Sequence, residues 1–184
     1  RNTGRPVLHM DIGGGTSNLA LIEDGKILRT GCLNVGGRLI KFDKKGEITY
    51  ISKVLSGIFH QRPGEIATQP ELHELAETLT QALEMAAGLR QTADLMEKLL
   101  TEETGQTWTP PDREVVLSFS GGVADCIARE LPWNEFGDLG PILGQTIRKS
   151  RLCRGQYALG RETIRATVIG AGSYSTQLSG STVY

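Results

Sequence analysis

Residues 9–22 read HMDIGGGTSNLALI, and the rest of the chain is best interpreted from this stretch. A short apolar run ends at Asp11, glycines follow at Gly13, Gly14 and Gly15, and an alternating apolar run continues to Ile22. The pattern predicts a strand, a tight glycine turn and a second strand. Because glycines lack a Cβ atom, their backbone amides can approach an anion closely, and several such amides form a nest suited to phosphate.

Asp11 stands at the edge of this turn. Mg²⁺ prefers few carboxylates and several waters, so we expect Asp11 to hold a hydrated Mg²⁺ beside bound phosphates. The amides of Gly13, Gly14 and Gly15 are expected to form that nest. The turn is neither a Walker loop, since no Gly-Lys-Ser/Thr follows, nor a Rossmann fingerprint, since no helix pattern follows. A glycine-rich hairpin without a ligand is the alternative interpretation.

The composition is that of an ordinary globular protein. The 184 residues suffice for one domain with a sizeable core. A net charge of −1 gives no electrostatic case for nucleic acid or an anionic membrane. No apolar run approaches the roughly 20 residues that span a bilayer, and residues 1–6 lack the apolar segment of a signal peptide. The three scattered cysteines lack metal-ligand spacing, so we expect free thiols in a reducing cytoplasm.

An antiparallel meander is expected around the glycine turn. Asp24-Gly25 is a two-residue hairpin signal, and it lies between strands expected over 16–23 and 26–34. With a first strand over 7–10, this gives three strands joined by tight connections. A second glycine pair, Gly36-Gly37, follows. Arg38 is then placed to open a helix or to reach a phosphate, with a solvated surface position as the alternative.

The middle of the chain is expected to be mostly helical. A short strand over 47–51 precedes helical spacing over 53–60. A longer apolar stripe runs over 69–100, and Gly88 is expected to bend or divide it. The helical block 53–101 is a candidate sub-lobe. His60 and His73 have no acidic or nucleophilic partner in sequence, so both are expected to be structural or solvated.

A second ligand-type turn follows a buried strand expected over 115–119. The chain there runs through Ser120 into Gly121-Gly122 and then into a helical pattern. The missing side chains would let a flat group lie against the backbone, and a helix N-terminus favours negative charge. Further on, Asp138 is expected to cap a helix over 141–149, and basic residues at 148, 149 and 151 complement the dipole of that helix. A final strand is expected over 163–169.

The order of these motifs resembles the superfamily of actin, the sugar kinases and the seventy-kilodalton heat-shock chaperones. The resemblance implies an α/β fold, a ribonuclease-H-like lobe of the actin-type ATPases, with a mixed five-stranded sheet, an antiparallel meander and helices on its faces. It implies that the first glycine turn is the second phosphate loop, that Gly36 and Gly37 lie near the nucleotide, and that Gly121 and Gly122 lie under adenosine. Residues 170–172 would form a hinge segment.

Longer stretches are similar to one family within that superfamily. DIGGGTSNLALIEDGKI, CLNVGGRLI, LSFSGGVADC, DLGPIL and TIRATVIGAG resemble the ethanolamine-utilisation protein A family, the reactivating factors of ethanolamine ammonia-lyase. The resemblance implies a chaperone that requires ATP and Mg²⁺ and releases damaged cobalamin from ethanolamine ammonia-lyase, so that intact adenosylcobalamin can enter. It implies that Asp11 lies near Mg²⁺ and the attacking water, and that Gly13, Gly14, Gly15 and Thr16 cradle the phosphates. It also implies a cytoplasmic location, with a bacterial microcompartment as a further site of association.

The resemblance further implies that residues 1–184 form one C-terminal-type lobe, and that a first lobe carrying the other phosphate loop precedes Arg1. The full-length protein would then hydrolyse ATP, whereas this lobe alone would bind ATP weakly and hydrolyse it negligibly. Two other functions remain open. One is a small-molecule kinase of the same superfamily, although no motif here supplies a base for an acceptor hydroxyl. The other is a non-enzymatic interaction domain that keeps the fold.

Overall fold

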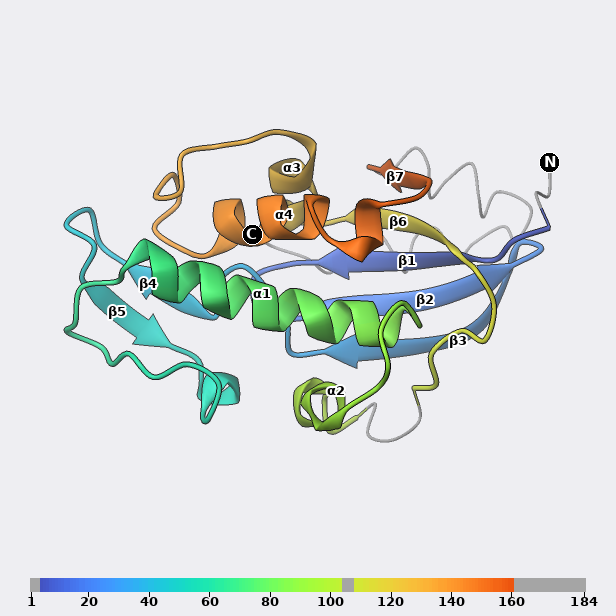
Figure 1. Cartoon of the computed structure of the whole chain (residues 1–184), viewed down its shortest axis with the longest axis horizontal. Coiled ribbons are helices and arrows are strands. Elements are labelled where there is room, and N and C mark those ends of the chain that lie inside the picture. The colour runs from blue at the N-terminus through green and yellow to red at the C-terminus, as the bar shows by residue number, and fades with distance from the viewer. Residues whose placement is uncertain (1–3, 104–107, 161–184) are drawn as a thin grey trace.

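A mixed five-stranded sheet forms the centre of the computed structural model, which describes residues 4–103 and 108–160 (Figure 1). Its strands are β1 (Val7–Ile12), β2 (Ser17–Glu23), β3 (Lys26–Leu33), β6 (Val116–Ser120) and β7 (Tyr157–Leu159). They lie in the order β3-β2-β1-β6-β7, so β1 is the central strand. β2 runs antiparallel to β1 on one side, and β6 runs parallel to β1 on the other. The α/β class and the mixed five-stranded sheet predicted from the sequence are confirmed.

The antiparallel meander is also confirmed. β2 pairs with both β1 and β3, and the β2–β3 connection turns at Asp24 and Gly25, with φ angles of 53° and 73°. Two successive positive φ angles define the two-residue turn that matches the twist of paired strands. The fifth strand of the sheet, β7, was not anticipated. It has only three residues, too few to show a period, and the strand expected over 163–169 lies outside the described residues.

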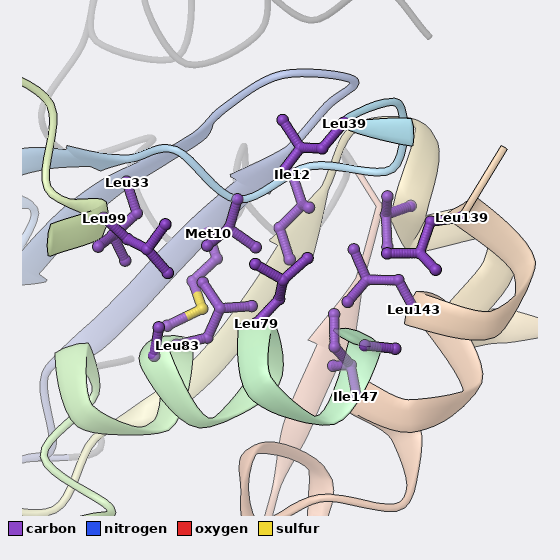
Figure 2. Close-up of a cluster of buried hydrophobic side chains, with 14 of the residues drawn as sticks. Met10, Ile12, Leu33, Leu39, Leu79, Leu83, Leu99, Leu139, Leu143 and Ile147 are labelled. Atoms are coloured by element: carbon purple, nitrogen blue, oxygen red, sulfur yellow. The ribbon is translucent and has the colours of Figure 1, made fainter. Parts of the chain in front are cut away.

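Three helices pack on one face of the sheet. They are α1 (Gln69–Ala86), α2 (Asp94–Leu99) and α4 (Gly140–Arg148). Figure 2 shows their apolar side chains meeting those of the sheet in one cluster. The labelled members are Met10, Ile12, Leu33, Leu39, Leu79, Leu83, Leu99, Leu139, Leu143 and Ile147. Since side chains alternate along a strand, burying Met10 and Ile12 here places His9 and Asp11 on the opposite face.

The segment after β3 departs from the helical expectations. No helix begins at Gly36-Gly37; the chain forms β4 (Ile40–Phe42) instead, which pairs antiparallel with β5 (Ile48–Ile51). The helix expected over 53–60 is reduced to one 3₁₀ turn, η1 (Lys53–Leu55). Gly57 has a φ of +78°, a left-handed conformation that ends a right-handed helix, so the apolar spacing there was misleading.

The division of the long helical block at Gly88 is confirmed. Gly88 has a φ of +76° just after α1, and α2 begins at Asp94. Glu84, buried on α1, accepts a hydrogen bond from Arg90 Nε at 3.0 Å and another from the Arg151 backbone amide at 2.9 Å. This carboxylate therefore ties α1 to the 3₁₀ turn η2 (Arg151–Cys153). None of the helices in the described ranges has the length and apolarity needed to cross a bilayer.

The final two α-helices of the described chain are linked by hydrogen bonds from a side chain of one to the backbone of the other. The N-cap of α4 is Leu139, one residue after the predicted Asp138, although Asp138 Oδ1 accepts a hydrogen bond from the Gly140 amide at 2.8 Å. Arg148, expected only to complement the dipole of α4, also donates to the carbonyls of Ile127 and Ala128 at 3.2 Å. Those carbonyls end α3 (Gly122–Ala128), which therefore gains a cationic partner at its C-terminus.

Candidate functional site

Three glycine turns meet at one edge of the sheet, where β1 ends. The turn 13–16 connects β1 to β2, the pair Gly36-Gly37 follows β3, and Gly121 follows β6. β1 and β6 run parallel with Asp11 opposite Ser120, so the carboxyl ends of both strands lie side by side. In α/β sheets such an edge is where ligands commonly bind. The structure thus brings together the three glycine motifs that were expected near a nucleotide, whereas the hinge segment expected over 170–172 lies outside the described residues.

The first turn has backbone amides that are not used in hydrogen bonds within the described ranges. It is closed by a hydrogen bond of 3.0 Å from the Gly13 amide to the Thr16 carbonyl. Within the described part of the chain, no group accepts a hydrogen bond from the amides of Gly14 and Gly15. Gly15 is exposed, and a Cβ atom added to it would meet nothing within 4 Å. This arrangement fits the anion nest expected from the sequence.

The second glycine pair packs against the first turn and is hydrogen-bonded to it. The Gly37 amide donates to the Gly13 carbonyl at 2.9 Å, and the Arg38 amide donates to the Gly14 carbonyl at 2.7 Å. A Cβ atom on Gly36 would lie 2.3 Å from the Gly14 carbonyl oxygen, so no larger residue fits without moving one of the loops. Gly36 and Gly37 are buried, and their nearest neighbours here belong to the first turn.

Gly121 brings the start of α3 against the end of β1. Its φ is +88°, and a Cβ atom there would lie 2.4 Å from the Ile12 carbonyl oxygen and 2.8 Å from Asp11 Oδ1. Gly122 is the first residue of α3, and both glycines are partly exposed. The approach of this turn to Asp11 depends on the missing side chain of Gly121.

Asp11 is buried and belongs to a line of polar side chains. Ser120 Oγ donates to Asp11 Oδ1 at 3.0 Å, and Ser120 Oγ lies 2.8 Å from His9 Nε2. His9 Nδ1 lies in turn 3.0 Å from Ser118 Oγ. Sequence analysis missed His9, Ser118 and Ser120 as site residues. The available signal was their alternation, because positions 9 and 11 share one face of β1 and positions 118 and 120 share one face of β6.

Arg38 is neither a helix opener nor an isolated surface residue. Its Nε lies 3.4 Å from Asp138 Oδ2, and its side chain is 41% exposed while that of Asp138 is 1% exposed. The position that a Cβ atom of Gly14 would take is 3.4 Å from Arg38 Cβ. Arg38 therefore lies beside the first glycine turn and joins it to Asp138, whose carboxylate accepts a hydrogen bond from the first amide of α4.

The family can be assigned with this geometry in view. The family model described as ethanolamine utilisation protein EutA matches residues 1–184. This chain belongs to the EutA family. Two curated relatives, each named ethanolamine ammonia-lyase reactivase EutA, come from Salmonella typhimurium and Escherichia coli and are 37% and 35% identical to it. Each alignment covers 97% of this chain and 39% of the relative, so the chain spans well under half the length of those EutA proteins.

A solved exopolyphosphatase from Cytophaga hutchinsonii is similar to part of this EutA-family chain. The match covers 67% of this chain and 28% of the exopolyphosphatase, at 20% identity and a TM-score of 0.30. Similarity at that level supports no argument about the fold, which is described from the chain's own strand order.

His9 is the residue of the site whose pKa departs most clearly from its usual value. Burial of the imidazole lowers the His9 pKa to about 4, and the nearby Asp11 carboxylate offsets part of that effect by raising it. The charged form of a histidine is disfavoured when water is removed. His9 is therefore neutral at physiological pH, and it has one hydrogen to donate and one lone pair to accept.

The other titratable candidates are two histidines and three cysteines, of which Cys32 contacts Thr16 in the first turn. His60 and His73 are exposed. The three cysteines are free, and burial raises the thiol pKa of Cys126 to about 11 and that of Cys153 to about 12. In the described ranges no group of three or more His, Cys, Asp or Glu side chains could enclose a metal. A lone carboxylate such as Asp11 fits Mg²⁺, which keeps most of its water ligands.

Proposed function

We propose that this chain is the nucleotide-binding lobe of an ATP-dependent reactivating factor, one that releases damaged cobalamin from ethanolamine ammonia-lyase. The observation that carries the proposal is the match of the whole chain to the EutA family. The names of the two curated relatives support the reactivase activity and ethanolamine ammonia-lyase as the partner. ATP dependence is supported by the convergence of the three glycine turns.

The lobe would have the ribonuclease-H-like, actin-type fold. An antiparallel β1–β2–β3 meander, followed by helices and then by a strand parallel to β1, supports this assignment. The helices α1, α2 and α4 cover one face, which leaves the edge beyond β1 and β6 for the nucleotide. A second lobe would complete the site, and the nucleotide state would alter lobe closure and hence the grip on the partner.

Each glycine turn would have a separate task. The amides of Gly14 and Gly15 would donate hydrogen bonds to phosphate oxygens, with Gly13 and Thr16 closing the turn. Gly36 and Gly37 would hold that turn in place through their contacts with the Gly13 and Gly14 backbone. Gly36 and Gly37 would therefore act on the nucleotide through the first turn and would not contact it themselves. These roles follow from the hydrogen bonds of the two loops. The carbonyls of Gly13 and Gly14 already accept hydrogen bonds, whereas the amides of Gly14 and Gly15 have no acceptor in the described part of the chain.

The third turn and Asp11 would supply the rest of this lobe's part of the site. Gly121 and Gly122 would lie beneath adenosine, and the missing side chain of Gly121 lets this turn pack against the end of β1. Asp11 would hold the water ligands of Mg²⁺ beside the phosphates. When bound, Mg²⁺ would neutralise phosphate charge and orient the attacking water.

The test is the Asp11→Asn variant in the full-length protein. Asparagine keeps the shape of the side chain but removes the charge that would attract hydrated Mg²⁺. We expect ATP-dependent reactivation of damaged ethanolamine ammonia-lyase to fall to the level without ATP, while the thermal unfolding profile keeps its shape. Asp112→Asn, a change at an exposed carboxylate before β6, is the matched control and should reactivate normally. Full reactivation by Asp11→Asn would refute the role given to Asp11.

Calorimetry with ATP and Mg²⁺ separates the proposal from a domain that only binds proteins. The full-length protein should bind, and residues 1–184 alone should bind more weakly, since the second lobe would supply part of the site. If neither binds at millimolar nucleotide, the nucleotide site is refuted and the non-enzymatic interaction domain becomes the better account. Binding without any reactivation would instead favour a kinase of the same superfamily.

A further inference from the structure

Ser118, His9, Ser120 and Asp11 form a continuous buried line across β1 and β6. Their exposed fractions are 1%, 1%, 8% and 4%, so water competes little for their hydrogen bonds. The three successive contacts measure 3.0, 2.8 and 3.0 Å. The line ends on the carboxylate that lies next to the first glycine turn.

The direction of these hydrogen bonds follows from counting protons. A serine hydroxyl carries one hydrogen, and that of Ser120 is donated to Asp11 Oδ1. In its contact with His9, Ser120 Oγ must therefore accept, so His9 Nε2 carries a hydrogen. In a neutral imidazole with hydrogen on Nε2, Nδ1 is the acceptor, and Ser118 donates to it. All three hydrogen bonds then point toward Asp11.

We propose that His9 and Ser120 are positioning residues for Asp11. His9, in its Nε2–H form, holds the Ser120 hydroxyl so that this hydroxyl donates to Asp11 Oδ1 and fixes the carboxylate. Gly121 leaves room for the same oxygen, since a Cβ atom there would lie 2.8 Å from it. The inference rests on the proposed function for what Asp11 does, whereas the direction of the hydrogen bonds stands on the contacts alone.

Fixing the carboxylate matters because the chemistry at this edge depends on geometry. A side chain at the end of a strand can rotate, and a displacement of about 1 Å in a reacting site can lower a rate by roughly 100-fold. Ser120 holds one carboxylate oxygen, and His9 in turn holds Ser120. The line also joins β1 to β6, so the first glycine turn and the turn at Gly121 share one rigid support.

The first experiment reads the tautomer of His9. Long-range ¹H–¹⁵N spectra are recorded on the full-length protein labelled with ¹⁵N-histidine, without nucleotide, near neutral pH. His9 is identified as the imidazole whose signals move in both Ser118→Ala and Ser120→Ala, because it contacts both serines. We expect a neutral ring with hydrogen on Nε2. Hydrogen on Nδ1 instead would overturn the proposed direction of the line.

The second experiment uses the two serines as a matched pair. Both are buried on β6 and both contact His9, but only Ser120 reaches Asp11. In ATP hydrolysis by the full-length protein with Mg²⁺, Ser120→Ala should lower kcat by about tenfold or more while KM changes by less than about threefold. Ser118→Ala should lower kcat much less, and Ser120→Thr, which keeps the hydroxyl, should regain most of it.

The outcomes separate positioning from general structural support. A structural role predicts that both alanine variants lower stability and activity alike, so equal falls in kcat would overturn the proposal, as would an unchanged kcat in Ser120→Ala. A wild-type protein that neither binds nor hydrolyses ATP would refute the proposed function and, with it, the task of Asp11. The tautomer measurement, made without nucleotide, would still decide the direction of the hydrogen bonds.

Discussion

His9 contributes a pH-dependent part to the free energy of unfolding. Its pKa is about 4 in the folded protein, whereas an exposed histidine has a pKa of 6.5. Between these two values the unfolded chain binds more protons than the folded one, so stability falls as pH falls. A shift of this size corresponds to up to about 3 kcal/mol, present above pH 6.5 and lost as the pH approaches 4.

The prediction is checked by urea unfolding at several pH values from about pH 7.5 to pH 4. Carboxylates also titrate toward the acid end of this range, so the comparison is made between variants. His9→Gln should show a flatter dependence than the wild type between pH 6.5 and pH 4. His73→Gln, which alters an exposed histidine, should follow the wild type. Identical slopes for His9→Gln and the wild type would contradict the assignment.

The junction between β6 and α3 should tolerate no side chain at Gly121. Its φ of +88° strains an L-residue, and an added Cβ atom would lie 2.4 Å from the Ile12 carbonyl oxygen. We expect Gly121→Ala to lower the free energy of unfolding by more than about 2 kcal/mol, since backbone must move. Gly15→Ala, in the open first turn, should change it by less than about 0.5 kcal/mol. Equal effects in the two variants, measured by chemical denaturation, would argue against this packing.

The sequence predicted those elements whose formation depends on residues close together in the chain. The Asp24-Gly25 hairpin and the strands on either side of the first glycine turn were expected nearly at their observed bounds, because turn residues fix the chain direction over a few positions. β4 and β7 were missed because three residues carry too little pattern. The helix expected over 53–60 failed because Gly57 takes a left-handed conformation that apolar spacing does not reveal.

The candidate site was predictable only as separate motifs. The glycine turns and Asp11 are visible in the sequence, but the packing of Gly36 on Gly14 depends on how two loops meet in space. The line from His9 to Asp11 requires the parallel register of β1 and β6, whose contacting side chains lie 109 to 111 positions apart. No local pattern encodes that register, so His9 and Ser120 were not recognised beforehand.

The helices and the sheet share one apolar core, so they should unfold together. The cluster includes residues of each of the four α-helices in the described ranges and of the sheet. Cys126 on α3 and Cys153 on η2 have thiol pKa values raised to about 11 and about 12, chiefly by burial, so little reactive thiolate exists while the protein is folded.

We therefore expect alkylation of these two thiols near pH 8 to follow global unfolding. In a urea series, their labelling midpoint should coincide with the loss of helical circular dichroism. Single Cys126→Ser and Cys153→Ser variants would show which thiol reacts at each urea concentration. Labelling of either thiol well before the loss of helix would show that α3 or η2 opens independently of the shared core.

The parallel pairing of β1 with β6 also has a consequence for the newly made chain. Ser120 is synthesised 111 residues after His9, which at about 5–20 residues per second takes roughly 6 to 22 s. During that time the central strand has an antiparallel neighbour on one edge and an unpaired edge on the other. An unpaired edge can recruit strands from other chains. We therefore expect nascent chains on ribosomes that pause before Val116 to aggregate more readily than those on ribosomes that pause after β6 has emerged.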